Sequence, residues 1–178
     1  MTASGTVRVG LAFVGLAVGV SSARAQSPEL IDRVLAVAAG DVIMLSDVRA
    51  GQDFGLVDVA GAADPVRAAL SQLIDRALIL HEVDRYAPPE PSVDALEDAF
   101  TAVRARFSTA AAFDAAMARA GMNEERLRAI VRQNLRLEAY LGQRFAVDSP
   151  ERRQTILDEW VAGLRRRADV VDLYGARR

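Results

Sequence analysis

The chain has 178 residues, of which 51% are hydrophobic and 26% are charged, with one histidine and no cysteine. A formal net charge of −2 disfavours nucleic acid or an anionic membrane surface as the main partner. The lack of cysteine excludes disulfide bonds and thiol catalysis, and a single histidine cannot build a zinc site of the usual kind. We therefore expect no metal ion and no cofactor.

The first 25 residues are typical of a secretory signal peptide. A short positively charged start precedes an apolar run over residues 9–20, which is too short to span a bilayer comfortably. A small-residue A-x-A site then predicts cleavage between Ala25 and Gln26, with an uncleaved anchor as the alternative. Cleavage leaves residues 26–178 as one domain of net charge −4, in a periplasmic protein without stable membrane insertion.

Residues 31–45 predict a β-hairpin, because two β-prone runs flank a turn at Ala39-Gly40-Asp41. A hairpin alone is marginally stable, so we expect another element to cover it. Ser46 or Asp47 is the expected cap of a short helix that runs toward Phe54. A loose, glycine-containing connection follows this helix.

Residues 64–86 predict the helix around which the chain is organised. Apolar side chains cover about half of its circumference, which is typical of a helix surrounded by other elements. Asp64 is the expected cap and Pro65 suits the first helical position. The prolines that follow Ala87 cannot continue the helix.

The rest of the chain predicts more helices and a last strand. The helices are expected over residues 92–107, 108–120 and 124–145 and from Ser149-Pro150 onward, with caps at Ser92, Ser108 and Asn123. Asp169 to Tyr174 is β-prone, and we expect it to pair with the hairpin so that the two ends of the mature chain meet. The fold class is mostly α (α+β), with helices over 46–145, a small antiparallel sheet, and a C-terminal helix and strand over 150–174.

The sequence offers no pair of residues suited to catalysis. His81 falls on the apolar face of the central helix, where we expect a hydrogen-bonded core histidine rather than a general base. Asn134 and Glu138 lie one turn apart within an apolar arc and can share a network with His81 or an arginine. Such a network is either a binding-site anchor or a feature that fixes the register of the core.

Four stretches of this sequence resemble the N-terminal chaperone domain of SurA-type periplasmic proteins, which assist outer-membrane protein assembly. They are IDRVLAVAAGDVIMLSDV, QLIDRALILHEVDRY, MNEERLRAIVRQNLRLEAYLGQRF and EWVAGLRRRADVVDLY, in this order. The resemblance implies a multi-helix domain of the SurA N-terminal and trigger-factor C-terminal kind. In the family, one or two parvulin isomerase domains lie between the long helix and the final helix. Here only residues 146–150 separate the helix expected over residues 124–145 from the last helix.

We therefore expect an ATP-independent holdase that binds unfolded outer-membrane or secreted polypeptides through an apolar groove. The candidate groove residues are the aromatic and methionine side chains Phe107, Phe113, Met117 and Met122, since methionine adapts to many ligand shapes. The alternative for this set is core packing between two short helices. Two other functions remain open: a prolyl isomerase that uses this scaffold, and a dedicated subunit of an envelope or secretion complex.

Overall fold

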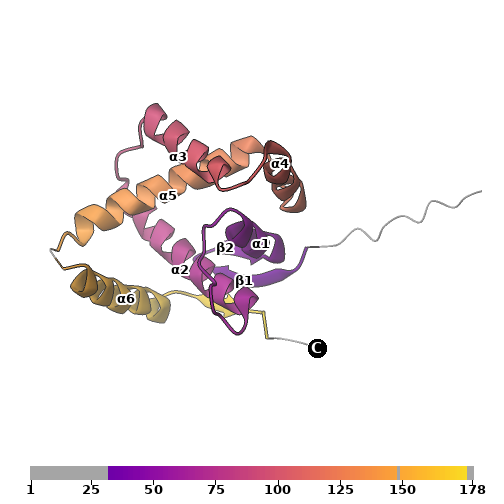
Figure 1. Ribbon diagram of the computed structural model, residues 1–178. Helices are drawn as coiled ribbons and strands as arrows, with labels where there is room; N and C mark the ends of the chain where they lie inside the picture. The colour runs from indigo at the N-terminus through magenta and orange to yellow at the C-terminus, as the bar shows by residue number, and fades with distance from the viewer. Residues whose placement is uncertain (1–31, 148, 176–178) are drawn as a thin grey trace, which may run out of the picture. The chain divides into compact units, whose positions relative to one another are not determined.

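The computed structural model describes residues 32–147 and 149–175, so the expected signal peptide lies outside the described residues (Figure 1). The described chain is mostly helical, as expected, with one three-stranded antiparallel sheet. Its elements follow in the order β1, β2, α1, α2, α3, α4, α5, α6 and β3.

The sheet brings both ends of the described chain together. Strands β1 (Val34–Ala38) and β2 (Asp41–Met44) form the expected hairpin. Its turn residues Ala39 and Gly40 have φ of 52° and 88°, the left-handed values that a two-residue hairpin turn requires. Strand β3 (Val170–Asp172) pairs antiparallel with the other side of β1, giving the strand order β2-β1-β3. This confirms the expected third strand.

Helix α1 (Leu45–Asp53) begins two residues earlier than a cap at Ser46 would place it, with Met44 at the cap position. The prediction of Ser46 or Asp47 as the cap was wrong. Asp47 instead accepts a hydrogen bond from the Met44 N–H at 2.9 Å, from inside the first turn. The Ser46 N–H donates to Asp32 at 3.1 Å, which ties the start of α1 to the start of β1.

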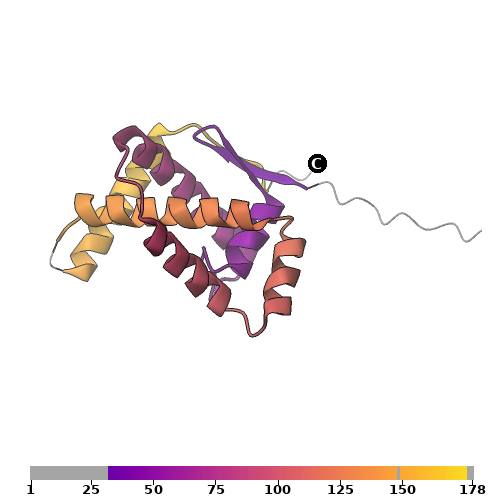
Figure 2. The same ribbon diagram turned by 90° about the horizontal axis from the view of Figure 1, so that it is seen from above.

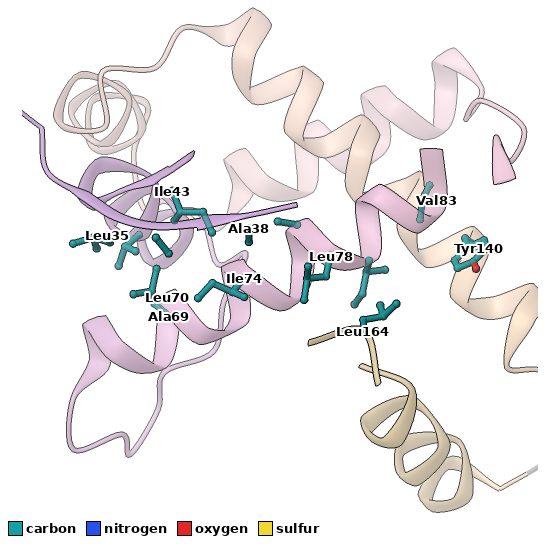
Figure 3. Packing of buried hydrophobic residues seen from close by; sticks show 14 residues of the cluster. Leu35, Ala38, Ile43, Ala69, Leu70, Ile74, Leu78, Val83, Tyr140 and Leu164 are labelled. Carbon is teal, nitrogen blue, oxygen red and sulfur yellow. The ribbon is translucent and has the colours of Figure 1, made fainter. Parts of the chain in front are cut away.

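Helix α2 (Pro65–Tyr86) is central, as predicted. Asp64 caps it by accepting the Arg67 N–H at 2.9 Å, and it ends where Ala87 takes a left-handed conformation before the prolines. It packs against β1, α1, α5 and α6. Figure 3 shows Leu35 of β1 and Ile43 of β2 over one end of α2, with Leu164 of α6 against its middle.

Four further helices complete the fold, and Figure 2 shows α5 crossing the described domain. They are α3 (Val93–Ala105), α4 (Ala110–Arg119), α5 (Glu124–Arg144) and α6 (Pro150–Arg167). The predicted caps Ser92 and Asn123 are confirmed by hydrogen bonds from the backbone three residues onward, and Ser149 caps α6 in the same way. Thr109 caps α4 in place of Ser108.

The core consists of two clusters. The first joins the sheet to α2, Tyr140 of α5 and Leu164 of α6. The second lies where α1, α3, α4 and α5 meet, around the fully buried Phe54. Phe54 contacts the ring of Phe113 at 6.1 Å between centroids in an edge arrangement that aromatic pairs favour. Each of the shorter helices is thereby held by aromatic packing rather than by its own length.

Candidate functional site

A cleft of about 370 Å³ lies between the hairpin and α5, and we call it the hairpin–α5 cleft. Strand β2 and helix α1 line one side, α5 lines the other, and α2 lies between them. Figure 1 labels these four elements. Ten of its fifteen lining residues are apolar, so the cleft favours an apolar occupant. These apolar residues are Val42, Ile43, Ala50, Leu56, Leu73, Ala77, Leu80, Met122, Ala129 and Ile130.

An ion pair connects the two walls of the hairpin–α5 cleft. Arg126 of α5 donates to Asp47 of α1 at 3.4 Å, and both side chains are partly exposed. A pair of this kind contributes about 0–1 kcal/mol because solvent screens it. Its contribution is therefore mainly to the position of α5 relative to α1 rather than to the stability of the fold.

A second polar contact involves Arg76 of α2, a lining residue of the hairpin–α5 cleft, which meets Asn134 of α5. The Nε and Nη2 atoms of Arg76 donate to the Asn134 side-chain oxygen at 3.1 and 2.6 Å. The Nη2 atom also lies 3.5 Å from the backbone oxygen of Ile130. Burial lowers the pKa of Arg76 below its ordinary value, because desolvation disfavours the charged guanidinium. Asn134 thus has an arginine as its partner, which was one of the two partners expected for it.

An open sheet edge borders the same cleft. In a two-residue hairpin the residues that flank the turn bond to each other, so the next pair, Val37 and Val42, is a non-hydrogen-bonded pair. Val37 is instead hydrogen-bonded on its β3 side, consistent with the 2.9 Å bond from the Leu173 N–H to the Leu35 oxygen. The backbone N–H and C=O of Val42 therefore point away from β1. Its side chain, which lines the cleft, is 53% exposed.

A second hollow, the α2–α6 pocket, has a volume of about 480 Å³ and lies on the other side of the hairpin turn. His81 lines it and is exposed, so the expectation of a buried core histidine was wrong. The physical reason is that α6 and β3 leave this part of the apolar face of α2 uncovered. Charged side chains make up much of the remaining lining, and one of them, Arg85, already pairs with Glu82 at 3.1 Å.

The four candidate groove residues do not form one surface. Phe113 and Met117 are 5% and 8% exposed and belong to the second core cluster, so their expected exposure was wrong. Phe107 is half-buried against the same cluster, 5.4 Å from the ring of Phe113. Met122 is half-buried and is the one member that lines the hairpin–α5 cleft. The core-packing alternative describes this set better.

Glu138 does not join Asn134 in a network, because its side chain is exposed. No group of three or more histidine, aspartate or glutamate side chains within residues 32–147 and 149–175 is placed to hold a metal ion. No helix in this part of the chain is both long and apolar enough to cross a membrane. The chemistry that the cleft offers is therefore apolar contact, one backbone edge and two guanidinium groups, of which that of Arg126 is already paired with Asp47.

Compared with known proteins, the chain matches no protein-family model and no curated protein sequence.

Sequence reasoning missed the hairpin–α5 cleft and, within it, Arg76. The cleft combines residues from four elements and two connections, and no periodicity in one segment reveals such a combination. The one signal was Asn134, a polar residue within an apolar arc, for which an arginine partner was expected.

Proposed function

We propose that this chain is a periplasmic, ATP-independent chaperone that holds unfolded outer-membrane or secreted polypeptides in the hairpin–α5 cleft. The observation that carries the proposal is an apolar cleft beside an open strand edge. An extended client can place side chains against the apolar walls while its backbone bonds to Val42. Backbone recognition is independent of sequence, which suits a protein with many clients.

Two further points support this proposal. The four stretches quoted above resemble the SurA N-terminal chaperone domain, and we propose that the helices and sheet form a domain of that kind. The signal-peptide pattern of residues 1–25 favours a periplasmic location, where ATP is not the expected energy source for a holdase. In this proposal the protein binds its client and catalyses no covalent step.

The proposal is tested by suppression of aggregation. An outer-membrane protein denatured in urea is diluted into buffer without ATP, with or without the mature chain, and light scattering is followed. We expect Ala129→Gln to weaken suppression, because Ala129 is an exposed residue of α5 that lines the cleft. Glutamine is a good helix former, so the change should cost less than about 0.7 kcal/mol of stability.

Ala139→Gln is the matched control, since Ala139 is an exposed residue of the same helix outside the cleft lining. It should suppress aggregation as well as the unchanged chain does. Equal activity of the two variants would place client binding outside the cleft. Failure of the unchanged chain to suppress aggregation at a severalfold molar excess would remove the chaperone function.

A further inference from the structure

Arg76 is a half-buried cation whose hydrogen-bonding partners are all neutral. None of the ion pairs among residues 32–147 and 149–175 involves it. Its hydrogen bonds go to the Asn134 amide and to one backbone oxygen. A charge removed from water without a counter-charge is unfavourable unless a partner supplies one. Arg76 is therefore a cation of the cleft that has no carboxylate partner among the described residues.

We propose that the hairpin–α5 cleft selects client segments in which an Asp or Glu side chain is flanked by apolar residues. This inference rests on the proposed function. Arg76 is the residue that binds the carboxylate. A guanidinium carries five N–H donors, and the Nη1 group of Arg76 donates to no atom of the described chain. The Nη1 atom is not fully buried, so a client carboxylate can reach it from solvent.

The acidic side chains of the cleft do not supply the missing charge. Asp47 is already engaged, because it accepts from Arg126 at 3.4 Å and from the Met44 N–H at 2.9 Å. Asp41 is exposed beside the hairpin turn and forms no ion pair with a described residue. It repels a client carboxylate from that end of the cleft, so the favoured position for the carboxylate is at Arg76.

The apolar walls decide what carries the carboxylate. A small inorganic anion would lose its hydration against ten apolar residues and gain one guanidinium. A polypeptide segment brings apolar side chains for the walls together with the carboxylate. A charge-assisted bond of this kind is stronger in a desolvated site than at the surface. The complementarity of charge therefore favours an acidic residue within an apolar segment.

The test compares two fluorescent peptides that are identical except for a central Glu or Gln between apolar residues. Binding to the mature chain is measured by fluorescence anisotropy. We expect the Glu peptide to bind about tenfold more tightly, which corresponds to about 1.4 kcal/mol. Raising the salt concentration should reduce this preference less than it would for a surface pair, because the site is partly desolvated.

Asn134→Asp is the decisive variant, because it gives Arg76 a carboxylate from within the protein. We expect this change to remove the preference for the Glu peptide while the domain stays folded, since aspartate has nearly the shape of asparagine. Arg76→Gln should remove the preference as well. Arg132→Gln is the control, because Arg132 is an exposed arginine of α5 outside the cleft lining, and the tenfold preference should persist.

Equal affinity of both peptides for the unchanged chain would overturn this inference, and so would a preference that survives in both Asn134→Asp and Arg76→Gln. If neither peptide binds while aggregation is still suppressed, carboxylate selection is refuted and the chaperone function stands. If suppression is absent too, the proposed function fails with it.

Discussion

Replacing Met117 by serine should destabilise the domain strongly. The Met117 side chain is 8% exposed within the second core cluster, beside Phe113 and Ala116 of the same helix. Truncating a buried methionine costs about 2–5 kcal/mol, and a buried hydroxyl without a partner adds about 1–3 kcal/mol. For a domain of this size, each kcal/mol lowers the melting temperature by about 2–4 °C, so a total loss of about 3–8 kcal/mol predicts a drop of at least about 6 °C.

Thermal melts and urea titrations followed by far-UV circular dichroism measure this effect. Met122→Ser is the matched comparison, because Met122 is half-buried at the hairpin–α5 cleft and should cost only about 1 kcal/mol. Below the melting temperature, the Met117→Ser variant should retain the proposed suppression of aggregation per folded molecule, whereas the Met122→Ser variant should lose part of it. A melting temperature within about 2 °C of the unchanged chain for Met117→Ser would refute the assignment of Met117 to the core.

Four other predictions follow from the sheet, the α2 cap and the sequence. Deleting residues 169–178 should cost about 2–4 kcal/mol in a urea titration, because β1 loses the strand on one side; an unchanged midpoint would contradict the pairing. The Arg67 N–H bond lowers the pKa of the Asp64 carboxyl below its ordinary 3.8. The stabilisation by this cap is therefore fully present above the pKa that Asp64 has in the unfolded chain. It is lost as the pH falls through the lower pKa that Asp64 has in the folded chain. The urea midpoint of the Asp64→Asn variant should fall less between pH 6 and pH 2 than that of the unchanged chain. An equally steep fall in both proteins would argue against the cap as the cause. N-terminal sequencing of exported protein should start at Gln26 rather than at Met1. The mature chain should not accelerate X-Pro isomerisation of a short peptide, and saturable acceleration would favour the isomerase alternative.

The features that could be predicted from sequence are those set by local chemistry. Asp64, Ser92 and Asn123 cap their helices because each side-chain oxygen needs only a backbone N–H three residues away. The hairpin was predictable for the same reason, since Ala39 and Gly40 form its turn within a short stretch. The third strand was predicted from its β-prone composition and from the marginal stability of an isolated hairpin, which another strand can relieve.

The features that could not be predicted depend on which neighbour covers a given face. His81 and Met117 both lie on apolar helix faces, yet one is exposed and the other is buried. A helical pattern shows which side is apolar but does not show where the adjacent helix ends. Phe113 and Met117 are buried because α1 brings Phe54 against α4, a contact between segments far apart in the sequence.

The pairing of β3 with β1 has a consequence for the order of folding. During synthesis from the N-terminus, the hairpin and α2 are available early, but the second neighbour of β1 is among the last residues of the described chain. The sheet therefore cannot be completed until β3 has been synthesised, and closure of such a long loop slows folding.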